Sequence, residues 1–272
     1  MFKRGLLICQ FILFFAVLYS QDRSIPNQNN STVLKLNGYI DSYLAMTPLQ
    51  TDSLITACDY LTSFSEDSLI KSYITQYLFE KFFSSRIMGM ESVAIHIAKN
   101  YYLNKKLECP DKMDLAEMQI YVDFNENSLL GMEAPALELK DLQDNKVLLR
   151  DVAAGYTLIY FFDDQCPVCK KELPQLKEIV ERYKSEELKV YAVYTQSVRE
   201  NFEKFIEQEF EDATIRQSWI FTWDPGFESN FHKLYNVMKT PQMFLLDNKK
   251  MIIGRNLDNQ ALEQLIKMNI SK

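Results

Sequence analysis

Glycine and histidine are scarce in this 272-residue chain, and their scarcity excludes several kinds of site. Only seven glycines are present, and the two nearest in sequence, Gly131 and Gly155, lie 24 residues apart. Glycine-rich phosphate loops need glycines a few residues apart, so the sequence contains no such loop. With only two histidines, His96 and His232, a histidine-rich metal centre is also excluded.

The chain has no excess of positive charge. Its 30 Lys and Arg residues stand against 37 Asp and Glu residues, which gives a formal net charge of −7. Because an acidic chain has no general attraction for phosphate backbones, nucleic acid is not an expected partner. The composition is 47% hydrophobic and 25% charged, which is typical of globular proteins, and the length allows two domains.

An apolar run near the N-terminus is typical of a secretory signal peptide. Two basic residues precede residues 5–18, which only Gln10 interrupts, and Ser20 and a polar stretch follow. Fourteen helical residues span about 21 Å, less than the roughly 30 Å of a bilayer core. We therefore predict a cleaved signal peptide over residues 1–20. An uncleaved anchor, with the membrane as a partner, is the alternative.

Residues 21–130 predict an all-α domain. Apolar residues recur there at helical spacing, and the helices that we expect cover about 51–64, 65–82, 90–103 and 112–130. Nothing in this half suggests chemistry, so we interpret it as a packing or docking domain.

Residues 131–272 predict an α/β domain. Residues 157–162 (TLIYFF) read as a central buried strand, and Asp144-Asn145 reads as a hairpin turn. Further strands are expected near 188–195, 218–223, 242–247 and 251–255, and helices near 168–183, 198–211, 227–237 and 258–269. This alternation predicts a sheet covered by helices on both faces.

Two cysteines open the first helix of that domain. Cys166-Pro-Val-Cys169 follows the TLIYFF strand by three residues, and cysteines at this spacing can close a short disulfide. Cys166 lies at the helix N-terminus, where unpaired N–H groups and the helix dipole favour a thiolate, while Cys169 lies one turn further in. We expect Cys166 to attack and Cys169 to resolve the mixed disulfide. No cofactor is expected beyond this redox-active disulfide.

Two other features accompany the cysteines. Glu172 lies one helical turn after Cys169, where a partly buried carboxylate can exchange protons with the pair; a solvated surface glutamate is the alternative. Thr240-Pro241 precedes a predicted strand, and a turn there would offer the Thr240 backbone to a peptide substrate.

Other uses of the Cys-x-x-Cys pair fit less well. A structural zinc site needs a second ligand pair, and neither Cys58 with Cys109 nor the histidines have suitable spacing. A purely structural disulfide stays open, although so short a loop stabilises little. A peroxidase has a hydroxyl residue three positions before its cysteine, where this chain has Asp163.

From residue 131 onward the chain resembles the TlpA-type thiol-disulfide oxidoreductases of the thioredoxin-like superfamily. The resemblance covers about half of the chain and rests on three motifs: G-x-x-A-P at 131–135, CPVCKKELP at 166–174, and Thr240-Pro241 before a strand. It implies a thioredoxin-like fold, with Cys166 as the nucleophile, Cys169 as the resolving thiol, Glu172 as a buried glutamate that tunes them and Pro241 as a cis-proline.

The chain departs from that pattern around the first cysteine. Gln165 stands where the family usually has an aromatic residue, and Tyr160 stands where thioredoxins proper carry a buried aspartate. Asp163 and Asp164 add negative charge near Cys166, which opposes the helix dipole. The helical first half resembles a domain of unknown function that precedes such modules in some Gram-negative envelope proteins.

These patterns together predict an exported thiol-disulfide oxidoreductase in the periplasm or cell envelope of a Gram-negative bacterium. Its expected partners are envelope proteins, whose disulfides it would reduce or exchange, and an envelope electron donor. The alternative is a client-binding scaffold that uses the thioredoxin fold without redox turnover.

Cys58 and Cys109 remain outside this scheme. An even number of cysteines in an exported chain favours pairing. Cys58, however, shares an apolar face with Leu54 and Leu61, as buried free thiols often do. We expect two unpaired structural thiols, and a disulfide between them is the alternative.

Overall fold

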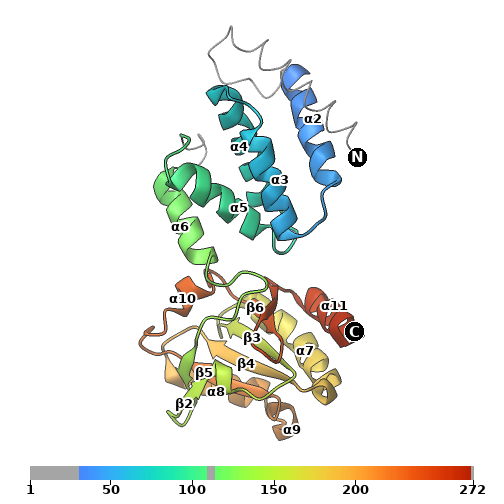
Figure 1. Cartoon of the computed structure of the whole chain (residues 1–272). Coiled ribbons are helices and arrows are strands. Elements are labelled where there is room, and N and C mark those ends of the chain that lie inside the picture. Colours follow the sequence, from blue (N-terminus) through green and yellow to red (C-terminus); the bar gives the residue numbers. More distant parts are fainter. Residues whose placement is uncertain (1–30, 109–113, 271–272) are drawn as a thin grey trace. The chain divides into compact units, whose positions relative to one another are not determined.

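The computed structural model describes residues 31–108 and 114–270 (Figure 1). The chain divides into two compact units, one up to Val122 and the other from Asp123 onward. The predicted signal peptide and Cys109 lie outside the described residues. Over the described ranges, no helix is both long enough and apolar enough to cross a membrane.

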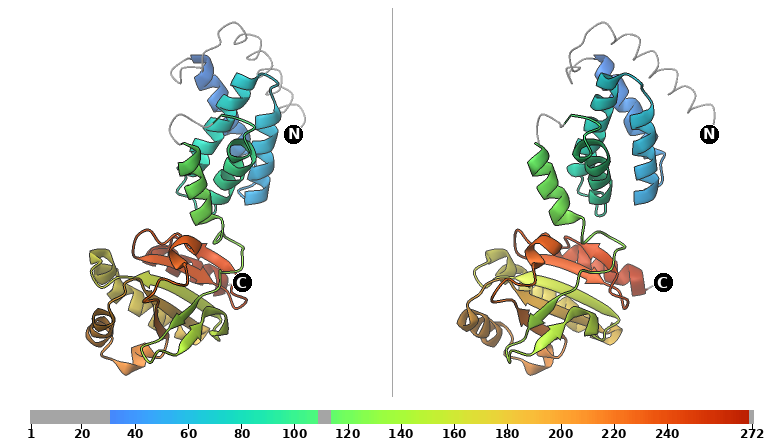
Figure 2. Two further views of the ribbon diagram at one scale, coloured as in Figure 1. Left: turned by 90° about the vertical axis from the view of Figure 1, so that its left-hand side faces the viewer. Right: turned by 60° about the vertical axis from the view of Figure 1, so that its left-hand side comes forward.

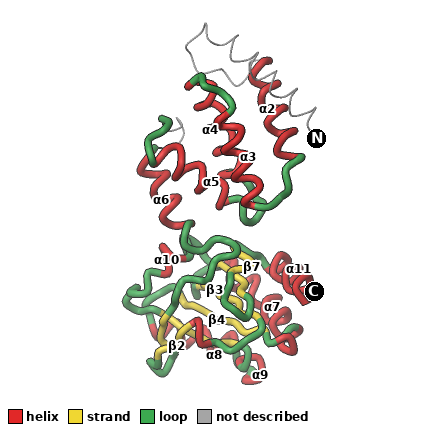
Figure 3. Tube along the Cα trace, in the orientation of Figure 1, coloured by secondary structure: helices red, strands yellow, loops and turns green. Residues whose placement is uncertain are grey.

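The first unit is helical, as its sequence predicts, with no strand among residues 31–108 and 114–122 (Figure 3). Apolar side chains repeat along each helix and bury one side of it, and α3 packs against its neighbours in this way. The helices are α2 (Ser31–Ala45), α3 (Thr51–Ser63), α4 (Ser68–Phe83), α5 (Glu91–Ile97), the π-helix η1 (Ala98–Leu103) and α6 (Leu115–Asn125).

Two helices of this unit differ from those expected. The helix predicted for about 112–130 is shorter, because α6 ends at Asn125 and a connection follows it. Helix α4 begins at Ser68, three residues after the predicted start at about 65, since the carboxylate of Asp67 accepts hydrogen bonds from the backbone N–H groups of Leu69 and Ile70 at 2.9 and 3.2 Å.

In the described part of the second unit, seven strands form one mixed sheet in the order β2-β1-β5-β4-β3-β6-β7. The TLIYFF segment lies in β3, which pairs in parallel with β4 and antiparallel with β6. The strands are β1 (Glu138–Lys140), β2 (Lys146–Leu148), β3 (Tyr156–Phe162), β4 (Leu188–Tyr194), β5 (Trp219–Trp223), β6 (Gln242–Leu246) and β7 (Ile252–Arg255).

Helices cover both faces of this sheet, as the alternation predicts (Figure 2). On one face Phe161 of β3 stacks against Phe231, while on the other Phe162 packs against Phe202 and Phe205. The helices of this unit are α7 (Pro167–Arg182), α8 (Arg199–Glu209), α9 (Ala213–Arg216), α10 (Phe231–Leu234) and α11 (Asn259–Ile270), with 3-10 turns η2 (Leu149–Asp151) and η3 (Lys184–Glu186).

The helix predicted for 227–237 is wrong over most of its length, because only α10 is helical there. The carboxylate of Asp224 accepts a hydrogen bond from the N–H of Ser229 at 2.8 Å and holds the preceding residues in a loop. Phe227 and Asn230 have positive φ angles of 54° and 56°, which a right-handed helix cannot contain.

Candidate active site

Cys166 forms the N-cap of α7, directly beyond the carboxyl end of β3. Its sulfur accepts a hydrogen bond from the backbone N–H of Cys169 at 3.1 Å, which satisfies one of the unpaired donors of the first helical turn. Pro167 occupies the first helical position, where its missing N–H costs nothing. The sequence around the motif therefore builds a helix start whose capping atom is a thiol sulfur.

The pKa values of the two cysteines are shifted in opposite directions. Burial acts to raise the pKa of Cys166, but hydrogen bonds from Cys169, Thr240 and the backbone N–H of Val168 outweigh it and the pKa is lowered. Burial raises the pKa of Cys169 to about 12, and the hydrogen bond with Cys166 adds to this shift. Cys166 is partly exposed, whereas Cys169 is fully buried. Both are free thiols, and of the two Cys166 has the lower pKa and is the one open to solvent.

Thr240 and Pro241 lie against the first cysteine, although they are far from it in sequence. The thiol of Cys166 donates a hydrogen bond to the carbonyl oxygen of Thr240 at 3.3 Å. The Thr240–Pro241 peptide bond is cis, as the resemblance implies. The structure thus brings two of the other predicted site residues, Cys169 and Thr240, into hydrogen-bond contact with the Cys166 sulfur.

Glu172 is neither free in solvent nor fully buried, with 35% of its side chain exposed. The side-chain amide of Asn259, at the start of α11, donates to the carbonyl oxygen of Glu172 at 3.0 Å and to its carboxylate at 3.2 Å. The same amide reaches the side chain of Gln175 at 3.3 Å. Asn259 was missed from the sequence, because a contact across 87 residues has no local signal.

The two acidic residues before Cys166, Asp163 and Asp164, accept hydrogen bonds from other residues. The carboxylate of Asp164 accepts a hydrogen bond from the hydroxyl of Tyr194 at 2.6 Å. Asp163 accepts from the backbone N–H of Gln165 and from the side chain of Gln196, both at 2.7 Å. These carboxylates hold the turn between β3 and α7, a structural role that their charge alone did not indicate.

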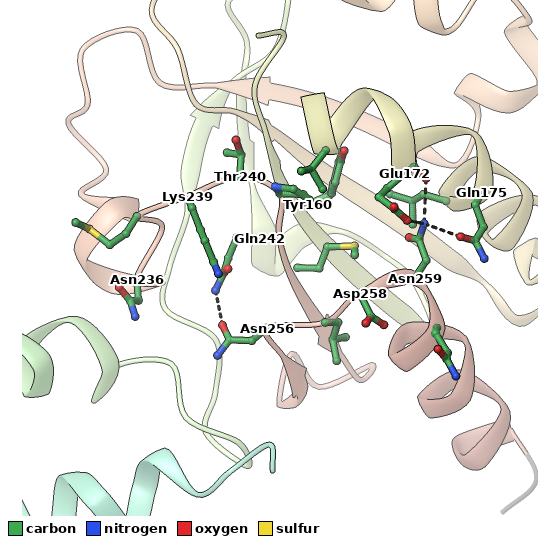
Figure 4. Close-up of a pocket in the computed structure, with 17 residues that line it drawn as sticks. Tyr160, Glu172, Gln175, Asn236, Lys239, Thr240, Gln242, Asn256, Asp258 and Asn259 are labelled. Carbon is green, nitrogen blue, oxygen red and sulfur yellow. Dashed lines mark hydrogen bonds between the residues drawn. The ribbon is translucent and has the colours of Figure 1, made fainter. Parts of the chain in front are cut away.

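A pocket of about 890 Å³ opens beside the cis-proline (Figure 4). Tyr160, Glu172 and Thr240 line it, together with the exposed apolar side chains of Val168 (51% exposed) and Met238 (73% exposed). Carboxamide side chains are frequent in its lining: Gln175, Asn236, Gln242, Asn256, Asn259 and Gln260. Carboxamides both donate and accept hydrogen bonds, so the pocket can match the groups of an extended peptide backbone.

No metal centre accompanies this site among the described residues, where no group of three or more His, Cys, Asp or Glu side chains is placed to hold an ion. The reactive groups that the arrangement presents are the two sulfur atoms. A mixed sheet with a Cys-x-x-Cys pair at a helix N-terminus and a cis-proline beside it defines a thioredoxin-like protein.

Comparisons with known proteins agree with this class. The AhpC/TSA family matches residues 130–255. The thiol-disulfide oxidoreductase ResA of Bacillus cereus is 29% identical over 150 residues, covering 54% of this chain and 80% of that protein. The thioredoxin-like protein YneN of Bacillus subtilis is 30% identical over 127 residues, covering 45% of this chain and 68% of that protein.

The fold of the whole chain also has a solved counterpart. The crystal structure of a thioredoxin-like protein from Bacteroides caccae covers 94% of this chain and 91% of its own, with a TM-score of 0.65 at 17% identity. This likeness includes the helical unit and shows the fold. The chain belongs to the thioredoxin-like family of thiol-disulfide oxidoreductases.

Proposed function

We propose that the protein is an exported oxidoreductase that reduces or exchanges disulfides of envelope proteins through the Cys166–Cys169 pair. The observation that carries this proposal is the opposed acidity of the two thiols, with a lowered pKa at the accessible sulfur and a raised one at the buried sulfur. A dithiol needs this asymmetry to attack in a fixed order.

The reaction begins at Cys166. Its thiolate attacks one sulfur of a client disulfide, the client S–S bond breaks, and the other client sulfur leaves as a thiolate. Cys169 then gives up its proton and attacks the Cys166 sulfur, which releases the second client thiolate and forms the Cys166–Cys169 disulfide. Two electrons pass to the client, whose two thiolates take up protons from solvent, and an envelope electron donor restores the dithiol.

Glu172 is suited to the proton transfer in the second step. It lies one turn after Cys169 on α7, it lines the pocket, and Asn259 fixes its position. A carboxylate held near a buried thiol can accept the proton that the thiol must lose before it attacks.

The client is an extended polypeptide segment that lies along the pocket beside Thr240 and Pro241. Its backbone can pair with the carboxamides of the lining, and its apolar side chains can contact Val168 and Met238 at the rim. Recognition through backbone groups suits an enzyme with several clients, because it does not depend on client sequence.

A trapping experiment tests this proposal. Cys169→Ser leaves the attacking thiol but removes the resolving one, so clients remain attached to Cys166 as mixed disulfides. We expect envelope proteins on non-reducing gels of cells that express the variant, and their release by dithiothreitol. Cys166→Ser is the matched control and captures nothing. A wild-type dithiol that never equilibrates with glutathione would instead favour a client-binding scaffold.

A further inference from the structure

Tyr160 is a buried side chain next to the reacting sulfurs that the proposed thiol exchange leaves without a role. It lies in the middle of β3, paired with Ala192 of β4 and Met243 of β6, and only 2% of it is exposed. It lines the same pocket as Glu172 and Val168 of α7 (Figure 4). The ring therefore projects towards the helix that carries both cysteines.

The hydroxyl of Tyr160 is what requires an explanation. Among the described residues, its oxygen is buried and has no hydrogen-bond partner. A buried hydroxyl without a partner is unfavourable, since it has lost water and gained nothing in return. Phenylalanine would fill the same space without this penalty, so the hydroxyl indicates a partner that forms only during the reaction.

Cys169 is the neighbour that can become that partner. Burial, and next the charge of the neighbouring Cys169 sulfur, raise the pKa of Tyr160 above its ordinary value, and the charges of Cys166 and Glu172 add to the shift. The phenol is thus protonated throughout the neutral range, so it can donate a hydrogen bond but does not act as a base. Its role differs from that of a carboxylate at the same place, which would act as a base.

We propose that Tyr160 is a catalytic residue that donates a hydrogen bond to the Cys169 sulfur whenever that sulfur carries negative charge. This inference rests on the proposed function, in which Cys166 attacks and Cys169 resolves. The charge exists at two stages: as Cys169 attacks the Cys166 sulfur of the mixed disulfide, and as Cys169 leaves when a donor thiolate opens the Cys166–Cys169 bond. The phenol keeps its proton in both steps.

The substitution Tyr160→Phe removes the hydroxyl and keeps the ring. The matched control is Tyr191→Phe, since Tyr191 is a fully buried tyrosine on the neighbouring strand whose hydroxyl bonds to the Val147 carbonyl instead. One equivalent of Ellman's reagent is added to each reduced protein in a Cys109→Ser background. The coloured thiolate is released once when Cys166 attacks and again when Cys169 resolves the mixed disulfide.

We expect Tyr160→Phe to leave the first release unchanged and to slow the second by about threefold for each unit that the pKa of Cys169 rises. The pH profile of the second release should move to higher pH in this variant alone. Two unchanged releases, or equal slowing of both, would overturn the role of Tyr160 while the two-step wild-type reaction stands. A wild-type protein without a second release would overturn the proposed function and this inference together.

Discussion

The backbone N–H of Cys169 donates a hydrogen bond to the sulfur of Cys166 across 3.1 Å. The buried cysteine thus supports the negative charge of the exposed one through its backbone, while its own sulfur is shielded from water. Together with hydrogen bonds from the side chains of Cys169 and Thr240, this contact lowers the pKa of the first thiol, and it needs only the three-residue spacing and a helix start at Pro167.

Cys166→Ser should reduce disulfide-reductase activity to the uncatalysed rate and leave the fold intact. Among the cysteines that the structure describes, only the one at the helix N-terminus is exposed enough to attack and has a lowered pKa. Insulin reduction with dithiothreitol measures the activity, and the urea midpoint of unfolding measures the fold. In the reduced wild type, iodoacetamide at neutral pH should label Cys166 before Cys169, and the reverse order would show that the roles are exchanged.

Glu172→Gln should lower the apparent pKa of the resolving thiol, because a carboxylate near a buried thiolate disfavours its charge. Glutamine keeps an oxygen that can accept the hydrogen bond from Asn259, so the midpoint of unfolding should change little. Thiolate absorbance against pH measures the titration. Glu178→Gln, an exposed position further along α7, is the control and should match the wild type. If Glu172→Gln also superimposes on the wild type, the carboxylate has no part in the chemistry.

Cys58 should make the folded state less stable at alkaline pH. Burial, and then the charge of Asp59, raise its pKa from 9.0 to about 12, so the unfolded chain loses this proton before the folded one does. The resulting stabilisation is complete below pH 9 and is lost as pH rises towards 12, by up to about 1.4 kcal/mol per pH unit.

Urea unfolding of wild type and Cys58→Ala between pH 7 and about 10.5 measures this effect. The alanine variant is less stable at neutral pH because it leaves a cavity, but the difference should narrow above pH 9. A difference that is constant with pH would contradict the buried-thiol assignment. In the structure Cys58 is a free thiol, so alkylation under denaturing conditions without reductant should modify it. A Cys58 that resists alkylation there would be paired.

Asp67→Ala should destabilise the helical unit by about 1 kcal/mol, since two backbone donors at the start of α4 lose their acceptor. Asp67→Asn retains a side-chain oxygen and should cost much less. Thermal unfolding followed by circular dichroism distinguishes the two variants. Equal destabilisation by both would mean that the carboxylate charge, rather than the cap, is what matters.

The sequence predicted the features that depend on neighbouring residues. The TLIYFF run becomes β3 because its five consecutive apolar residues suit a strand buried on both faces, and the cysteine pair lies at the following helix start because Pro167 favours that position. Both are decided within a dozen residues of chain.

The features that could not be predicted from the sequence depend on contacts between residues that lie far apart in the chain. Thr240 accepts a hydrogen bond from Cys166, which lies 74 residues away in the sequence. Tyr194 donates one to the carboxylate of Asp164, which lies 30 residues away. The loop around Phe227 was predicted as a helix from the sequence pattern. In the structure the carboxylate of Asp224 accepts a hydrogen bond from Ser229 and holds a loop there instead. At each of these positions the local structure depends on a contact made by a side chain. Such contacts form only when the tertiary fold brings the residues together.

Under the proposed role of Glu172, Asn259 gives α11 an influence on the acidity of the redox centre. Its single amide group holds the carbonyl and the carboxylate of Glu172 on one helix while its own backbone belongs to another. A rotation or shift of α11 would therefore move the carboxylate relative to the buried thiol without altering either cysteine. The spacing between two packed helices thus becomes a means of adjusting the reactivity of the enzyme, and substitutions in the α7–α11 interface can tune it while the reacting atoms stay the same.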